Sequence, residues 1–182
     1  MQRDYFTDDI NKKLEQFHLI FDRNNDLLTS VLRGHMIVEE RLHDVITAGV
    51  ACYFRPNDRN DIFTFGTATE LCRSILGQAA SPDIWVAIKS LNNLRNAIGH
   101  RNKPARLGSL LIRFFKDSES IASMVYKGGA HYDTEGESES THAIAVRVRI
   151  RAIWTILGIL ADDLAYDLED ALKTRRHCPR NS

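Results

Sequence analysis

Residues 91–101 read Leu91-Asn92-Asn93-Leu94-Arg95-Asn96-Ala97-Ile98-Gly99-His100-Arg101, so an arginine, an asparagine and a histidine meet a glycine at the end of a helical pattern. We expect Gly99 to end the helix in the left-handed conformation, with Ile98 as the C-cap. On an unbroken helix, residues five apart point roughly 140° away from each other. A break at Gly99 would fold His100 back towards Arg95, so that a fixed cation and an imidazole share one small site.

The remainder of the chain is dominated by apolar residues that repeat at helical spacing. Five such patterns predict helices near residues 8–21, 28–49, 63–76, 82–98 and 146–172. The third pattern places Thr67, Leu71 and Ile75 on its inner face and stops at Gly77. The segment 107–115 fits either a short helix or a strand, and both readings remain open. The sequence therefore predicts an all-α protein, an up-and-down bundle of about five helices.

Length and patterning indicate one domain. The chain of 182 residues is long enough to bury a full hydrophobic core. We expect a single helical domain over residues 1–182, with its core over about 26–172. A polar stretch over about 127–142 contains the run Glu135-Gly136-Glu137-Ser138-Glu139-Ser140 and predicts a long, solvated acidic loop.

The composition excludes several classes of protein. The 24 Lys and Arg residues balance 24 Asp and Glu residues, so a polyanion would have to meet a local basic patch. Three cysteines without CxxC or zinc-finger spacing predict reduced thiols and a cytoplasmic location. The N-terminal residues show no signal-peptide pattern, and Asp162 and Asp163 interrupt the longest apolar run, so no membrane contact is expected.

The stretch Leu94-Arg95-Asn96-Ala97-Ile98-Gly99-His100 resembles the arginine–polar–histidine signature of HEPN domains, which are helical bundles of many prokaryotic toxins and defence proteins. Residues 33–42 resemble the early core helix of these domains, and residues 63–71 resemble the segment before the motif helix. With residues 145–172, the layout is also similar to the mannitol operon repressor branch. The Arg–His motif is the specific part of this resemblance, because helical patterns are generic.

The resemblance implies a metal-independent endoribonuclease that needs no cofactor. His100 would transfer a proton at the ribose 2′-hydroxyl or at the leaving oxygen, Arg95 would hold the scissile phosphate, and Asn96 would orient the pair or bind phosphate. Histidine titrates near neutral pH, and arginine stays charged and forks onto phosphate oxygens, so the residue types suit these roles. A helix C-terminus favours the protonated imidazole, which suits a general acid.

A single Arg–His pair supplies too few groups for both proton transfers of RNA cleavage. Members of the family bring two motifs to one cleft by dimerising. The resemblance therefore implies a two-fold homodimer that acts on RNA, with the motif at its interface. A toxin of this kind would also have an antitoxin as its protein partner.

Two alternatives remain open for the motif. Arg95 can instead pair with Glu39 or Glu40 across the bundle, with His100 acting only as a helix cap. The repressor branch resembles the inactive members of the family. On that interpretation the chain is a non-catalytic regulatory module that acts through partner proteins.

Basic residues follow the motif closely. We predict that Arg101, Lys103 and Arg106 bind substrate phosphates, with Arg113 and Lys116 in the same cluster. Phe114 and Phe115 lie among them. A solvated basic turn, balanced by the acidic loop, explains the same residues equally well.

His35 lies on the apolar stripe of the second predicted helix, and Glu39 follows it by one turn. We predict that His35 is a hydrogen-bonded core histidine that supports the site rather than a catalytic group. Glu39 is predicted to partner either His35 or Arg95. His131 and His142 flank the acidic loop without metal-ligand spacing, so no metal site is expected.

Overall fold

The computed structural model describes residues 26–50, 63–99, 104–126 and 139–177. These ranges form helices and no strands, which confirms the predicted all-α bundle. The elements are α2 (Leu27–Gly49), α3 (Phe65–Leu76), the 3₁₀ helix η1 (Gly77–Ala79), α4 (Pro82–Gly99), α5 (Pro104–Asp117), α6 (Glu119–Val125) and α7 (Glu139–His177). The helix predicted over residues 8–21 lies outside the described residues.

Local side-chain chemistry sets several helix ends. Asp26 caps α2 by accepting a hydrogen bond from the backbone N–H of Thr29 at 2.9 Å. The hydroxyl and the N–H of Thr29 together hold the pKa of Asp26 below its usual value. The hydroxyls of Thr64 and Ser81 accept backbone hydrogen bonds at the starts of α3 and α4. Gly77 ends α3 with φ 51°, a left-handed conformation that glycine adopts without strain, so the predicted stop is confirmed.

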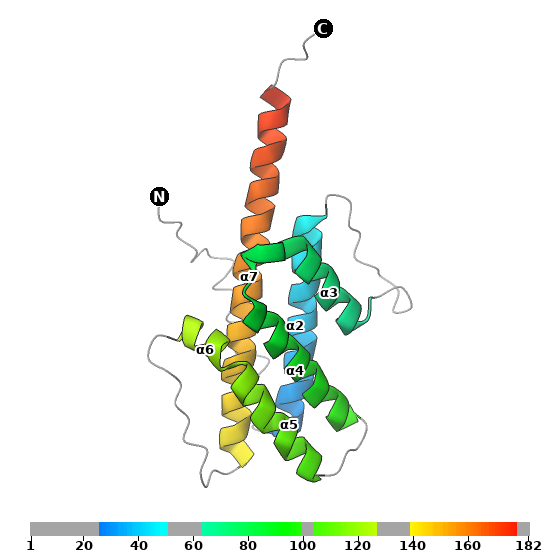
Figure 1. The fold of residues 1–182 in the computed structure, drawn as a ribbon, viewed down its shortest axis with the longest axis vertical. Coiled ribbons are helices and arrows are strands. Elements are labelled where there is room, and N and C mark those ends of the chain that lie inside the picture. The colour runs from blue at the N-terminus through cyan, green and yellow to red at the C-terminus, as the bar shows by residue number, and fades with distance from the viewer. Residues whose placement is uncertain (1–25, 51–62, 100–103, 127–138, 178–182) are drawn as a thin grey trace.

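The centre of the bundle is the pair α2 and α7, which lie side by side and run in the same direction (Figure 1). Gly34 of α2 permits this close approach, because a Cβ at that position would collide with the Ile150 side chain of α7. The side chains between them are fully excluded from solvent, including Val31, Val38, Leu42, Val45 and Ile46 of α2 and Val146, Ile150, Ile153 and Leu157 of α7. This interface is the main hydrophobic core.

The other helices cover this pair. Both α3 and α4 pack on α2, α5 packs on α4, and α6 packs on α7. The segment 107–115, which the sequence left undecided, is helical within α5. Leu111 and Phe114 are buried with a helical spacing of three residues, and Leu107 and Leu110 pack partly on the core. Packing against α4 therefore selects the helix.

Two sequence predictions are wrong in detail. The inner face of α3 is formed by Phe65, Ala68, Cys72 and Leu76. Of the predicted face, Leu71 and Ile75 are half-buried and pack on the core, whereas Thr67 is exposed. The reason is tertiary, because Phe65 stacks on the His35 ring and so sets the rotation of the helix. The acidic loop also ends earlier than residue 142, since α7 begins at Glu139.

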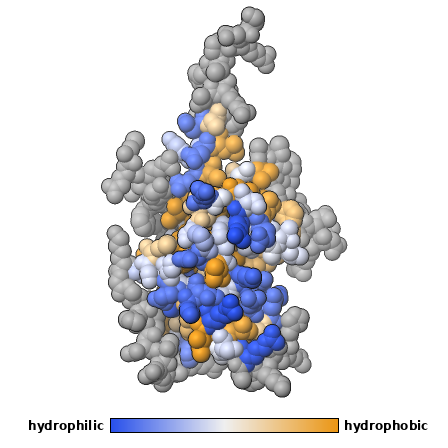
Figure 2. Space-filling model, viewed as in Figure 1, coloured by the Kyte–Doolittle hydropathy of each residue, from blue (hydrophilic) through white to orange (hydrophobic). Residues whose placement is uncertain are grey.

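The C-terminal part of α7 projects beyond the other described helices (Figure 1). Ala161 is its last buried residue, and the described side chains of residues 162–171 are exposed or half-buried. On the face seen in Figure 2, hydrophilic side chains predominate over the region of α5, with apolar residues scattered among them. None of the helices in the described ranges is both long and apolar enough to cross a membrane.

Candidate functional site

The motif lies on the last two turns of α4. The inner face of this helix is buried at Ile84, Ile88, Leu91 and Leu94, as the pattern predicted. Asn92 and Asn96 lie at the edge of this face and are half-buried, whereas Arg95, one turn after Leu91, is exposed. Asn92 and Asn96 lie one turn apart, so their side chains can meet on the helix surface.

The expected left-handed break at Gly99 is wrong. Gly99 is the last residue of α4, and among the described glycines only Gly77 has a positive φ. The space at Gly99 is instead used by a neighbour, because a Cβ there would lie 3.9 Å from Nη1 of Arg95. Arg95 thus extends along the helix towards its C-terminal end. His100, Arg101 and Lys103 lie outside the described residues.

A chain of hydrogen bonds connects Arg95 to the core, and we call its members Arg95, Asn96, Asn92 and His35 the Asn92 network. Nη1 of Arg95 donates to Oδ1 of Asn96 at 3.2 Å. Nδ2 of Asn96 donates to Oδ1 of Asn92 at 3.5 Å, and Nε2 of His35 donates to that same oxygen at 3.1 Å. An exposed cation on α4 is therefore linked to a buried imidazole on α2.

His35 is held tightly at the inner end of this network. It is 6% exposed, and its ring stacks on Phe65 with a centroid distance of 4.0 Å. Since an amide oxygen can only accept, neutral His35 carries its proton on Nε2. Burial lowers the pKa of His35 below 6.5 and the Arg95 charge adds to this effect, whereas the hydrogen bond to Asn92 opposes it. His35 is thus buried and hydrogen-bonded, as predicted.

The alternative partners of Arg95 are two glutamates of α2. Glu39 is half-buried and has a partner of its own, and Glu40 is exposed. In the described part of the chain, the hydrogen bond of Arg95 goes to Asn96 and not to either glutamate. The arginine therefore remains accessible to a ligand from solvent.

The predicted basic cluster is described in part. Arg106, Arg113 and Lys116 are exposed on α5, within about 80° of each other around its axis. Arg113 forms an ion pair with Asp117 at 3.4 Å, which reduces its local positive charge. Phe114 is fully buried, so it cannot stack on bases.

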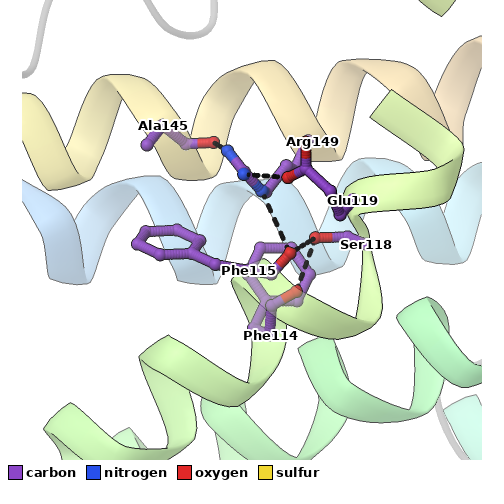
Figure 3. Close-up of polar contacts among 6 residues, drawn as sticks. All are labelled: Phe114, Phe115, Ser118, Glu119, Ala145 and Arg149. Atoms are coloured by element: carbon purple, nitrogen blue, oxygen red, sulfur yellow. Dashed lines mark hydrogen bonds and ion pairs between the residues drawn. The ribbon is translucent and has the colours of Figure 1, made fainter. Parts of the chain in front are cut away.

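A buried arginine on α7 was not predicted from the sequence. Arg149 is 7% exposed, and its Nη2 donates to Oε2 of Glu119 at 2.6 Å (Figure 3). It also donates to the carbonyl oxygens of Phe115 and Ala145 at 3.4 Å and lies 4.8 Å from the Phe115 ring centroid. The His142 ring is also nearly parallel to the Phe115 ring, with a centroid distance of 6.2 Å. This cluster joins α5, α6 and α7, and the only sequence signal for it is an arginine inside an apolar stripe.

A second buried arginine lies between α2 and α7. Arg41 is 6% exposed, forms an ion pair with Asp44 at 2.9 Å and lies 4.1 Å from the Trp154 ring centroid. Gly158 leaves room for its guanidinium. The cation–π contact and the ion pair compensate part of the cost of burying this charge. Both buried arginines are structural elements of the bundle.

No group of three or more histidine, cysteine or acidic side chains is placed to hold a metal ion within residues 26–50, 63–99, 104–126 and 139–177. The Asn92 network is the candidate site, because it brings the exposed Arg95 and the polar Asn96 together on a rigid helix. Comparisons with models of protein families, with curated proteins and with solved structures found no match for this chain. The resemblance to HEPN domains therefore remains a prediction from the motif.

Proposed function

We propose that the protein is a metal-independent endoribonuclease of toxin or defence type, in which Arg95, Asn96 and His100 act from two copies of the chain. The observation that supports this proposal best is the exposed Arg95 guanidinium, held by Asn96 on the end of a helix anchored in the core. A guanidinium so presented suits a phosphodiester, whose oxygens accept paired hydrogen bonds. RNA supplies both the phosphate and the internal nucleophile.

The chemistry follows from these groups. The ribose 2′-oxygen attacks phosphorus and loses its proton to a base, while the bond from phosphorus to the 5′-oxygen breaks. An acid gives its proton to that 5′-oxygen, so the products carry a 2′,3′-cyclic phosphate and a 5′-hydroxyl. Arg95 would stabilise the charge on the non-bridging oxygens. His100 of one copy serves as the base and His100 of the other as the acid.

In this proposal the second copy covers exposed apolar side chains of α2. Leu28, Leu32 and Met36 are exposed on α2 at four-residue spacing. They lie within about 100° of His35 around the axis of α2. Exposed apolar side chains on the helix that holds His35 support a two-fold contact that would bring two motifs together.

The test is RNA cleavage by the purified full chain in EDTA. We expect 2′,3′-cyclic phosphate products, and we expect His100→Ala and Arg95→Ala each to lower the rate by about 100-fold or more. Arg73→Ala is the matched control, because Arg73 is an exposed arginine on α3. If RNA stays intact at high concentrations of the wild-type chain, the proposed ribonuclease activity is refuted.

A non-catalytic regulatory module, similar to the mannitol operon repressor, is the second candidate. The observation that favours it is the projecting part of α7, where residues 162–170 include five carboxylates and no basic residue. Such a surface repels RNA and suits a basic protein partner. An antitoxin or a regulatory protein would bind there, in the cytoplasm. This candidate would be favoured if the chain purifies in a stoichiometric complex with such a protein and the free chain cleaves no RNA.

A further inference from the structure

Asn92 stands at the branch point of the network described above. Its Oδ1 accepts from His35 of α2 at 3.1 Å and from Asn96 of α4 at 3.5 Å. An amide oxygen has two lone pairs, so both bonds can form at once. Removal of this one oxygen therefore breaks the hydrogen-bonded connection between Asn96 and the buried His35.

The two ends of the network differ in how firmly they are held. At the inner end, His35 is buried and stacked on Phe65 at 4.0 Å. At the outer end, Arg95 is exposed, and its long side chain has many rotamers unless a partner holds it. Asn96 is the hydrogen-bond partner of Arg95, and Asn92 is the hydrogen-bond partner of Asn96. Through this series of hydrogen bonds, the packed core fixes the orientation of the Arg95 guanidinium.

We propose that Asn92 is a positioning residue of the site: it fixes Asn96, and through Asn96 the Arg95 guanidinium, in the orientation that receives the scissile phosphate. This role rests on the proposed ribonuclease function, since it is defined by the phosphate that Arg95 would bind. Asn92 itself touches no substrate. A displacement of about 1 Å in a catalytic group can cost about 100-fold in rate, so loss of this support is measurable.

The test compares three variants of the full chain. Asn92→Leu keeps the size of the side chain but removes the acceptor, whereas Asn92→Asp keeps an oxygen for both donors. Asn93→Leu is the matched control, because Asn93 is exposed at the next position of the same helix. We expect Asn92→Leu to lower kcat by about tenfold or more with a smaller change in KM. Asn92→Asp should restore most of kcat, and Asn93→Leu should leave it unchanged.

A second measurement needs no activity. The hydrogen bond to Asn92 raises the pKa of His35, so Asn92→Leu should lower that pKa further in an NMR titration. The side-chain Nε–Hε resonance of Arg95 should also broaden or shift. If Asn92→Leu matches Asn93→Leu in kcat, in the pKa of His35 and in the Arg95 resonance, the positioning role is overturned. A wild-type chain that cuts no RNA refutes the function instead, while the NMR comparison still decides whether Asn92 orients Arg95.

Discussion

Gly34 of α2 lies directly against Ile150 of α7, so closely that a Cβ at this position would collide with the Ile150 side chain. The contact lies within the main core, where Ile150 is fully buried. A Cβ at Gly34 would meet the terminal Cδ1 of Ile150 first, and it would also lie 3.0 and 3.2 Å from Cγ1 and Cγ2, so rotation of the terminal methyl alone does not relieve the contact. The close packing of α2 on α7 therefore depends on one missing methyl group.

Gly34→Ala should destabilise the protein by about 1–3 kcal/mol, because overpacking a tight core outweighs the better helix propensity of alanine. Chemical denaturation of both proteins measures the difference. Gly108→Ala is the control, since a Cβ at Gly108 of α5 meets nothing within 4 Å. The free energy of unfolding of that variant should rise by about 0.5–1 kcal/mol. Equal effects at the two glycines would contradict the close approach.

Glu119→Gln should weaken the junction of α6 and α7. Arg149 is almost fully buried, but Glu119 is 52% exposed, so solvent screening limits the loss to about 1 kcal/mol. Asp117→Asn is the comparison, because the Arg113 side chain opposite it is 70% exposed and the pair should contribute less than about 0.5 kcal/mol. The urea midpoints of the two variants measure both changes in stability. A larger loss of stability in Asp117→Asn than in Glu119→Gln would show that the ion pair between Arg149 and Glu119 is weak.

The stability of the protein should fall as the pH drops below 6.5, partly because of His35. The pKa of this residue is lowered in the folded chain from its usual 6.5, so the unfolded chain binds a proton first as the pH falls. The contribution of neutral His35 is thus complete above pH 6.5 and is lost between 6.5 and the lower folded pKa. Denaturation curves of wild type and His35→Gln across this window give the contribution by difference. If stability depends on pH in His35→Gln just as it does in the wild type, His35 is not the group responsible.

Met36→Asp should dissociate the dimer that we propose. Met36 is 64% exposed on α2, next to His35 in the sequence, and a carboxylate there would have to be buried in the proposed two-fold contact. Ile112→Asp is the matched control, because Ile112 is 70% exposed on α5, away from α2. Light scattering should show the lower mass for Met36→Asp alone. A monomeric wild type, or equal masses in both variants, would rule out this surface.

Cys72 should resist thiol reagents in the folded protein. Burial raises its pKa to about 12, and its Sγ donates a hydrogen bond to the Leu42 carbonyl oxygen at 3.1 Å. In a variant that lacks Cys52 and Cys178, modification at pH 8 should therefore require unfolding. Reaction with Ellman's reagent, followed with and without denaturant, measures this. Fast modification of the native chain would show that α3 opens readily.

Local chemistry made much of the fold predictable. The apolar repeats of α2, α4 and α7 identify most of their buried faces, because each repeat has the period of the helix, but Leu28 and Leu32, which belong to the repeat of α2, are exposed. Two helix ends also follow from local chemistry. The Ser81 side chain accepts a backbone hydrogen bond at the start of α4, and Gly77 adopts a positive φ at the end of α3. The expectation of a left-handed Gly99 is wrong because glycine permits a positive φ but does not require it, and Gly99 is the last helical residue of α4.

The sequence by itself determined the helices, their main inner faces and the grouping of Arg95 and Asn96 at the end of one helix. Only the tertiary structure decided that His35, 57 residues away from Asn92 along the chain, is the group that holds this motif from inside. It also decided that Arg149 and Arg41 are buried. The physical reason is that periodicity reports which face of a helix is apolar, whereas the choice of partner depends on which helices meet and at what rotation.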